Sequence, residues 1–454
     1  MSKLAILGGE PLIKEHAPKE LFKWPIITEE DKKAVMEIVE TNNFSGIDKT
    51  EEFQTQFAKW QGRKYAVAYT NGTMSLAAAM FAVGIGAGDE IICTTKTYWA
   101  SITQAVSLGA TPVFCNINDM LSMDVDDLEN KITKKTKAIM VVHYIGYPCD
   151  MDRIMEIANK HGIYVIEDVS HAQGSLYKGK KCGNFGHIAA MSMMSGKSFA
   201  AGEMGMVVTD DKKLYERAIA YGHYERNNAE YITESQDLKD YFHIPLGGVK
   251  GRVNQLCAVL GMGQLKYFDE RSAEIRNAMN YFFDLIEDLP GITPLRVDES
   301  TGSTMGAFYN ATAIYDPMAL EGLSSKRFCD AVRAEFNGAF SSWEGGNYCL
   351  HTHDYFKTYD FLHLGKPSRV VFSDRDARED DKNLDSALKK CCFSVPWFKK
   401  FDKEWIEKYA SVFRKVVENY KDLLDGDVDK VQGGRWHGLE NAKNQQKTNS
   451  GWIR

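Results

Sequence analysis

Long apolar runs are missing from this chain of 454 residues. No stretch approaches the roughly 20 consecutive apolar residues that a membrane span needs, and the first ten residues lack the apolar core of a secretory signal. An excess of basic residues is missing too, because 55 lysines and arginines stand against 62 aspartates and glutamates. The sequence therefore predicts neither a membrane-bound nor a nucleic-acid-binding protein.

Cysteine motifs are absent as well. The nine cysteines are scattered, no CxxC occurs, and several, such as Cys93 and Cys115, lie inside apolar runs that are typical of strands. This usage predicts reduced, buried thiols in a cytoplasmic protein, with neither a disulfide framework nor a metal site.

The chain does have a regular alternation of apolar strands and helical patterns between residues 64 and 210. Such alternation predicts an α/β fold, a three-layer arrangement around a mostly parallel sheet. The carboxyl ends of the strands then meet at one edge, where ligands bind. The expected strands cover residues 64–69, 90–94, 111–117, 138–144, 163–168, 188–194 and 206–209.

A chain of this length also predicts more than one domain. The composition shifts after residue 252, where a long helical stretch begins, and again after 425, where the sequence becomes polar. We expect an N-terminal arm and helix at 1–50, a large ligand-binding domain at 51–265, a smaller C-terminal α+β domain at 266–425 and a polar tail at 426–454.

Lys197 lies between two of the expected strands, residues 188–194 and 206–209. A lysine in such a place costs free energy unless its charge is removed or paired. A desolvated amine can instead condense with an aldehyde to form a Schiff base. Taken alone, a loop lysine that faces water is the commoner case.

Three further groups follow expected strands upstream of that lysine. Gly72 and Thr73 open a helix, where backbone N–H groups and the helix dipole favour an anion. Tyr98 follows the next strand, where an aromatic ring can stack on a planar cofactor. Asp168 and His171 close a later strand, where a carboxylate can hold a pyridinium proton and a histidine can reach a phenolic oxygen. Each group by itself is more often a helix cap, a core aromatic or a turn residue.

Together these groups match one cofactor. Pyridoxal phosphate needs an anion cradle for its phosphate, a stacking face, an acidic partner for its ring nitrogen and a lysine for its aldehyde. All four occur in that order between residues 70 and 197. That all four groups occur in this order by chance is less expected than that they form one site.

The order and spacing resemble the DegT/DnrJ/EryC1/StrS family of sugar aminotransferases, within the fold type I class of pyridoxal-phosphate enzymes. The resemblance extends from about residue 5 to residue 424. The motifs that carry it are Asn71-Gly72-Thr73, Gly88-Asp89-Glu90-Ile91, Thr97-Tyr98-Trp99-Ala100-Ser101, Glu167-Asp168 and Gly202-Glu203-Met204-Gly205.

The resemblance implies a role for each ring-contacting position. Lys197 corresponds to the Schiff-base lysine and Asp168 to the partner of the ring nitrogen. Tyr98 corresponds to the stacking aromatic, and His171 takes the position that hydrogen-bonds the cofactor hydroxyl. Lys197, Asp168 and His171 are therefore the expected catalytic residues.

The resemblance also implies the phosphate contacts. Gly72, Thr73 and Ser192 match phosphate-binding positions. Lys250 stands where the family has an asparagine that reaches the phosphate of the neighbouring subunit, and a lysine there could still bind phosphate. Met204 replaces a glycine, which narrows the site or only repacks a strand end.

The reaction implied is transfer of an amino group from glutamate or glutamine to a keto-sugar or keto-cyclitol, in a cytoplasmic homodimer with shared active sites. Two alternatives stay open, a dehydratase or lyase of the same family and a catalytically silent sugar-binding or regulatory homologue. Lys197 argues against the dehydratase, because a histidine replaces the lysine in that branch.

A loop rich in aromatic residues and glycine, at 340–348, is the expected contact to the substrate. A packed surface loop is an equal alternative for it. The substrate itself, whether a nucleotide-linked keto-sugar, a free cyclitol or an octulosonate sugar, stays open. The substrate-binding residues predicted in this loop are Trp343, Glu344, Asn347 and Tyr348.

Overall fold

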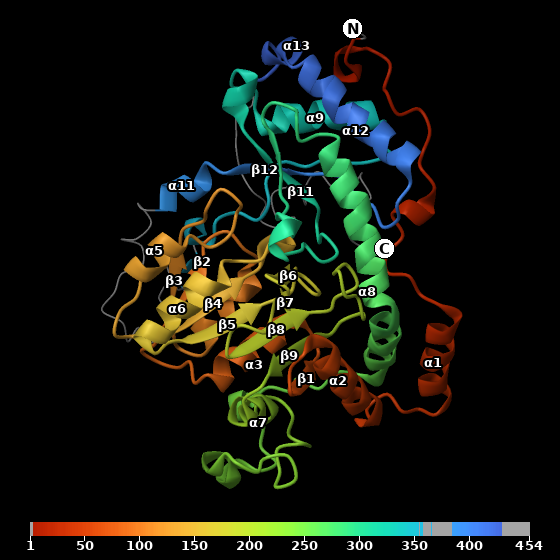
Figure 1. Cartoon of the computed structure of the whole chain (residues 1–454). Helices are drawn as coiled ribbons and strands as arrows, with labels where there is room; N and C mark the ends of the chain where they lie inside the picture. Colours follow the sequence, from red (N-terminus) through yellow and green to blue (C-terminus); the bar gives the residue numbers. More distant parts are fainter. Residues whose placement is uncertain (1–2, 354, 357–364, 366–383, 429–454) are drawn as a thin grey trace.

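A seven-stranded sheet forms the centre of the computed structural model, which describes residues 3–353, 355–356, 365 and 384–428 (Figure 1). The strand order is β1-β9-β8-β5-β4-β2-β3, and β9 is antiparallel to both of its neighbours while the other six strands share one direction. The predicted α/β fold with a mostly parallel sheet is confirmed. The strands are β1 (Tyr65–Tyr69), β2 (Glu90–Thr94), β3 (Thr111–Cys115), β4 (Thr136–Val142), β5 (Tyr164–Asp168), β8 (Ile188–Ser192) and β9 (Gly205–Thr209).

Helices cover both faces of this sheet. Successive side chains of a strand point to opposite faces, so Ile166 packs in the core beneath α3 (Gly72–Ala82), α4 (Thr103–Ser107) and α7 (Lys212–Ala220). Its neighbour Val165 packs on the other face against α5 (Val125–Asn130) and α6 (Met151–His161). Farther along that second face lie α2 (Asp48–Gln61) and the start of α8 (Gln255–Asp284).

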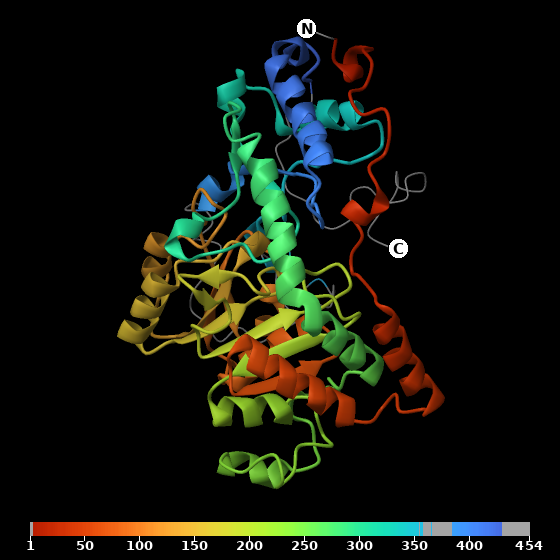
Figure 2. The same ribbon diagram turned by 45° about the vertical axis from the view of Figure 1, so that its right-hand side comes forward.

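A second, smaller sheet lies beyond the carboxyl ends of the large one (Figures 1 and 2). Its antiparallel strands are β10 (Ile292–Pro294), β11 (Thr312–Tyr315) and β12 (Cys391–Ser394), in that order. It shares an apolar core with α9 (Ser325–Phe336) and α12 (Lys403–Glu418). The remaining elements are α1 (Glu29–Glu40), the hairpin β6 (Leu176–Tyr177) and β7 (Lys180–Lys181), α11 (Asp385–Leu388) and α13 (Lys421–Leu424).

The long helix α8 joins the two sheets, because it contacts α1 and α2 at one end and α12 at the other. The expected domain boundary between residues 265 and 266 falls inside this helix, so the division into domains stays a prediction. Most of the expected polar tail, residues 429–454, lies outside the described residues.

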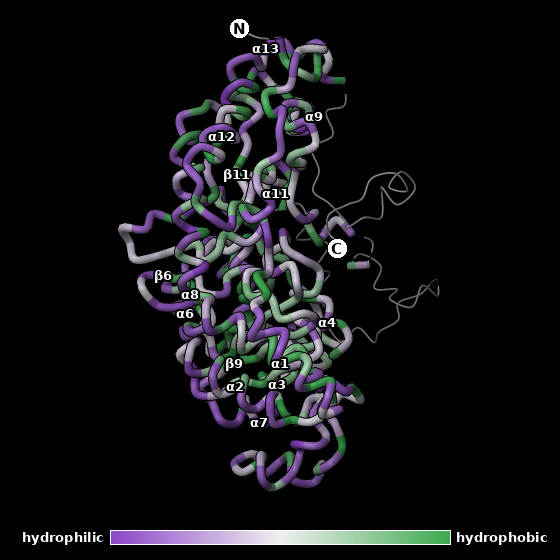
Figure 3. The backbone as a smooth tube through the Cα atoms, turned by 90° about the vertical axis from the view of Figure 1, so that its right-hand side faces the viewer, coloured by the Kyte–Doolittle hydropathy of each residue, from purple (hydrophilic) through white to green (hydrophobic). Residues whose placement is uncertain are grey.

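Hydrophobic segments gather toward the interior, and hydrophilic ones run along much of the outline (Figure 3). All nine cysteines are buried free thiols, as the sequence predicts. Among the described residues, no helix is both long enough and apolar enough to cross a membrane.

Candidate active site

Lys197 lies in the loop between β8 and β9, and only 8% of its surface is exposed. Its Nζ lies 3.4 Å from the hydroxyl oxygen of Tyr309 and 4.4 Å from the centroid of that ring. The indole of Trp24 donates a hydrogen bond to the Lys197 backbone oxygen at 2.9 Å. The amine is therefore enclosed at the carboxyl edge of the sheet and does not face water.

Tyr309 also connects the lysine to His171, because the two rings stack with centroids 4.4 Å apart. The backbone N–H of Ile145 donates to Nδ1 of His171 at 3.1 Å. Since Nδ1 accepts this bond, the neutral imidazole carries its proton on Nε2. The geometry thus brings Lys197 and His171 together through a tyrosine that the sequence analysis did not single out.

Asp168, the last residue of β5, is 4% exposed and is oriented by two serines. The hydroxyl of Ser101 donates to its Oδ2 at 2.7 Å, and the backbone N–H of Ser170 donates to its Oδ1 at 3.0 Å. Thr97 lies 3.0 Å from the Ser101 hydroxyl. These neighbours hold the carboxylate at one angle. Ser101 belongs to a motif already quoted from the sequence, although no role was assigned to it.

The turn between β1 and α3 presses against the end of β8. A Cβ added at Gly72 would lie 2.4 Å from the Cβ of Ser192, so glycine is required there. Asn71 caps the helix, and its side chain accepts from the N–H of Met74. The N–H groups of Gly72 and Thr73, in the first turn, have no intrahelical acceptor. This turn has the chemistry of an anion cradle next to Ser192.

Tyr98 is half-buried, and its ring lies 4.9 Å from that of Trp99. Burial is the main cause that raises the pKa of the Tyr98 hydroxyl, with smaller contributions from Tyr309 and Glu203. The role of Tyr98 as a stacking ring stays a prediction.

The two departures from the family pattern have different surroundings. Lys250 is exposed, with Nζ 5.7 Å from the ring of Tyr224. Gly251 beside it accepts a hydrogen bond from Thr70 N–H, so this segment lies next to the anion cradle of its own chain. Met204 is fully buried in an apolar cluster beneath the sheet, which favours repacking of the strand end over narrowing of the site.

The predicted substrate loop divides into two parts. Asn347 reaches the site, because the hydroxyl of Tyr144 donates to its Oδ1 at 2.9 Å and accepts from its backbone N–H at 2.8 Å. Trp343 and Glu344 instead lie against Arg333 of α9, with the guanidinium 4.8 Å from the indole centroid. Tyr348 is half-buried beyond Asn347. The substrate roles of all four residues stay predictions.

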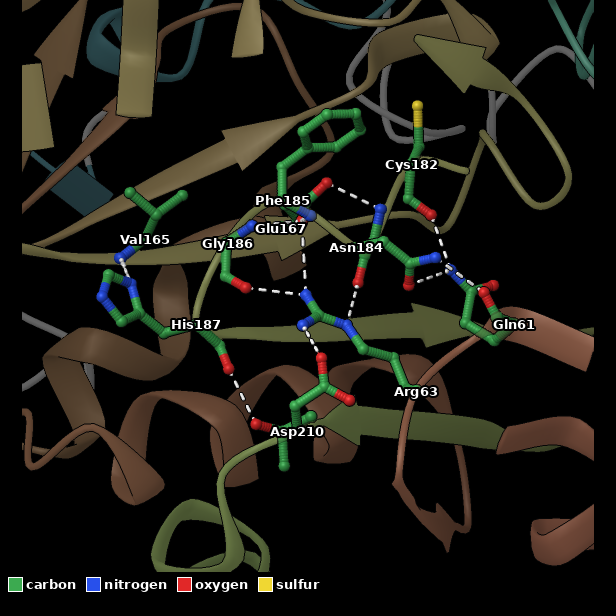
Figure 4. A network of polar contacts seen from close by, with 12 residues as sticks. Gln61, Arg63, Val165, Glu167, Cys182, Asn184, Phe185, Gly186, His187 and Asp210 are labelled. Atoms are coloured by element: carbon green, nitrogen blue, oxygen red, sulfur yellow. Dashed lines mark hydrogen bonds and ion pairs between the residues drawn. The ribbon is translucent and has the colours of Figure 1, made fainter. Parts of the chain in front are cut away.

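Glu167 precedes Asp168 and anchors the opposite face of the strand (Figure 4). Its carboxylate accepts hydrogen bonds from the backbone N–H groups of Gly183, Phe185 and Gly186 at 2.6–2.8 Å, and His143 lies 3.0 Å away. Burial alone would raise the pKa of Glu167, but the bonds from His143 and the backbone outweigh it and lower the pKa. The loop that leads into β8 is thereby fixed to β5.

The site therefore has two sides. We call Asp168, His171, Ser192 and Lys197, from the large sheet and its loops, the first wall. We call Tyr309 and Asn347, from the loops of the small sheet, the second wall.

Comparison with known proteins agrees with this architecture. The chain matches the DegT/DnrJ/EryC1/StrS aminotransferase family over residues 25–334. It is 39% identical over 251 residues to GDP-perosamine synthase of Escherichia coli O157:H7, an alignment that covers 54% of this chain and 65% of that protein, just under two thirds of its length. It is 30% identical over 338 residues to a putative L-glutamine:3-amino-2,3-dideoxy-scyllo-inosose aminotransferase of Micromonospora echinospora, covering 73% of this chain and 78% of that protein.

A solved structure extends the agreement to the whole fold. The aminotransferase from Psychrobacter cryohalolentis superposes with a TM-score of 0.73 at 28% identity, over 89% of this chain and 99% of the other. The family and the enzyme class expected from the motifs are confirmed. The chain belongs to the DegT/DnrJ/EryC1/StrS aminotransferase family.

Proposed function

We propose that this protein is a pyridoxal-phosphate-dependent aminotransferase that converts a keto-sugar or keto-cyclitol to the amino sugar, with glutamate or glutamine as the amino donor. The observation that carries the proposal is the enclosed amine of Lys197, 3.4 Å from the Tyr309 hydroxyl and next to His171. Asp168 and Ser192 lie at the same edge of the sheet, at the ends of β5 and β8.

The residues fit pyridoxal phosphate by their chemistry. The absence of a side chain at Gly72 lets the start of α3 lie against Ser192, and the N–H groups of this first turn suit a phosphate. Asp168 offers an oriented carboxylate to a protonated ring nitrogen, and His171 offers an N–H to a phenolic oxygen. Lys197 offers the amine that an aldehyde requires.

In the reaction, the bound cofactor supplies an electron sink for the negative charge that develops on the substrate carbon. Asp168 would keep the proton on the ring nitrogen, and His171 Nε2–H would donate to the phenolic oxygen. In the donor half of the reaction, Lys197 Nζ would take a proton from the α-carbon of the amino acid as general base, and in the acceptor half it would give a proton to the former ketone carbon of the sugar as general acid. Tyr309 positions Nζ for both transfers.

The names of two relatives, which contain a GDP-linked amino sugar and an amino-inosose, support a sugar or cyclitol substrate. A homodimer in the cytoplasm, in which Lys250 contributes to the partner's phosphate site, belongs to the same proposal. Lys250 is exposed, as a residue that reaches across an interface must be in one isolated chain.

The test is spectroscopic. Protein loaded with pyridoxal phosphate is expected to show a visible absorption band that borohydride fixes covalently, and L-glutamate is expected to remove the band with stoichiometric release of the oxo acid. Lys197→Ala removes the band. A dehydratase would not release the oxo acid stoichiometrically, and a silent homologue would stay colourless.

Lys399 offers a matched control. It is a second buried lysine, 4% exposed, whose Nζ packs on the faces of Trp24 and Trp397. Lys399→Met removes a buried amine close to the site but is expected to keep the band. A band that survives Lys197→Ala, or that disappears in both variants alike, contradicts the proposal.

A further inference from the structure

Lys96 is a buried lysine with no carboxylate in contact among the described residues. It follows β2 at the carboxyl edge of the large sheet, is 3% exposed, and forms an isolated antiparallel bridge with Cys349. In the part of the chain that the structure describes, its Nζ makes neither a hydrogen bond nor an ion pair. Burying an unpaired ammonium costs several kcal/mol, so a partner absent from the bare chain is expected.

The described neighbours of Lys96 do not balance its charge. Among the described residues, the thiols of Cys349, Cys391 and Cys392 interact with it electrostatically. Burial is the main cause that raises the pKa of each thiol, so all three are neutral near pH 7. A neutral thiol is a weak acceptor and supplies no negative charge.

Three of the four other buried lysines of the described chain have a partner or a chemical role, whereas Lys399 packs only on the rings of Trp24 and Trp397. Lys415 lies 2.8 Å from Glu335, and Lys131 lies 3.8 Å from Asp127. Lys197 is the reactive amine. Lys96 has no such carboxylate, yet it occupies the edge where the strands of an α/β sheet present their ligands.

Tyr144 connects Lys96 to the active site. The Tyr144 ring lies 5.6 Å from that of His171. At its other end, a Cβ added at Gly346 would lie 2.6 Å from the Tyr144 hydroxyl and 3.7 Å from Cys392 Sγ. Lys96 pairs with Cys349, two positions after Asn347, and interacts electrostatically with Cys392, so it lies on the side of Tyr144 where Asn347 binds the hydroxyl.

We propose that Lys96 binds a carboxylate of the substrate, at the end of the molecule remote from the reacting carbon. This inference rests on the proposed function, because the reacting carbon is the one next to Lys197. Tyr309, His171 and Tyr144 form the chain of contacts from Lys197 toward Lys96, so the carboxylate that Lys96 binds is several bonds away from the carbon that changes. Lys96 is a specificity residue and takes no part in proton transfer.

Two substrates contain such a carboxylate. One is a keto-sugar acid, whose carboxylate and ketone stand at opposite ends of the carbon chain. The other is glutamate as donor, whose side-chain carboxylate is remote from its α-carbon. The shared chemistry is a carboxylate held by a desolvated ammonium, and the two sources are separated by testing the two halves of the reaction.

The variants are Lys96→Met, which keeps the length and removes the charge, and Lys96→Gln as a polar second choice. Lys399→Met is the matched control, because it removes another buried and unpartnered ammonium. The acceptor probes are 5-keto-D-gluconate and L-sorbose, which differ at one terminal carbon, a carboxylate against an alcohol. The donor probes are L-glutamate and L-alanine, which differ in the remote carboxylate.

If the acceptor provides the carboxylate, calorimetry on the holoenzyme is expected to show that 5-keto-D-gluconate binds at least tenfold more tightly than L-sorbose. Lys96→Met reduces that preference to within twofold, whereas Lys399→Met keeps it. If the donor provides it, Lys96→Met raises the concentration of L-glutamate needed for half-maximal bleaching of the visible band at least tenfold, with L-alanine unchanged.

Either result supports the proposal and identifies the source. The proposal is overturned if the unmodified protein has no carboxylate preference in either half, or if both Lys96 variants keep the preference. Failure of the proposed function looks different, because the unmodified protein would then lack the visible band or its response to any amino donor. The melting temperature of each variant reports folding independently, and removal of the unpaired charge is expected to leave it equal or higher.

Discussion

The two walls of the site differ in how the chain builds them. The first wall comes from residues 168–197, and its members stand at the ends of adjacent strands of one sheet. The second wall comes from residues more than 100 positions later, in loops of a different sheet, yet Tyr309 touches both Lys197 and His171. The comparison teaches that the proposed reactive groups are encoded in a short segment, while Tyr309, which contacts two of them, comes from far away in the sequence.

The largest effect is expected where the first wall is broken. Asp168→Asn keeps the shape but removes the negative charge that holds the ring-nitrogen proton, so kcat is expected to fall about 10²–10³-fold. Steady-state kinetics with L-glutamate measures it. The control is Asp210→Asn, which removes an ion pair with Arg63 at the opposite end of the sheet. Equal losses in both variants would contradict a specific role for Asp168.

The next largest effect is expected on stability, because Glu167 fixes the loop that leads into β8 to β5. Glu167→Gln weakens the charged bonds to three backbone N–H groups and is expected to lower the free energy of unfolding by about 3 kcal/mol. Since folding lowers the pKa of Glu167 below 4.5, its contribution is complete above that pH and disappears as the pH falls through the lower folded value. Urea unfolding at pH 7 and pH 3 measures the difference between the two proteins, which should shrink at pH 3. A difference that is constant with pH would count against the anchor.

A change at Tyr309, the second-wall residue that contacts Lys197, is expected to lower kcat less than Asp168→Asn does. Tyr309→Phe keeps the stack on His171 and removes the hydroxyl that contacts Lys197, a loss of about 1 kcal/mol or roughly fivefold in kcat. The control is Tyr315→Phe, which removes a buried hydroxyl that donates to the backbone oxygen of Leu323 in the small-sheet core. If Tyr309→Phe leaves kcat unchanged, the tyrosine only packs.

The smallest effects are expected in the loop at 340–348, where Asn347 belongs to the second wall and Trp343 does not. Asn347→Ala is expected to raise KM for the keto-substrate about fivefold, since it frees the Tyr144 hydroxyl. Trp343→Ala is expected to change KM less than about twofold, because its indole packs on Arg333 and is 41% exposed. If Trp343→Ala raised KM more than Asn347→Ala, the loop would present Trp343, and not Asn347, to the substrate.

Much of the first wall is predictable from the sequence because parallel strands bring their ends to one edge. Asp168, Ser192 and Lys197 follow apolar runs whose register in the sheet leaves little freedom. Tyr309 was not predicted as a site residue, because it lies in a loop just before β11 and its contacts with Lys197 and His171 span more than 100 positions. Lys96 and Tyr144 were not predicted as site residues for a related reason. Their partners Cys349 and Asn347 come from the part of the chain that belongs to the small sheet.

The neighbours Glu167 and Asp168 give the strand a further property. Because consecutive side chains point to opposite faces, Glu167 belongs to the loop clamp and Asp168 to the proposed active site, and neither can substitute for the other. A slip of β5 by one position that turned Asp168 toward Gly183–Gly186 would leave Val169 at the proposed active site. The alternation therefore fixes the alignment of β5. When Glu167 accepts the hydrogen bonds from Gly183, Phe185 and Gly186, Asp168 points toward the proposed active site.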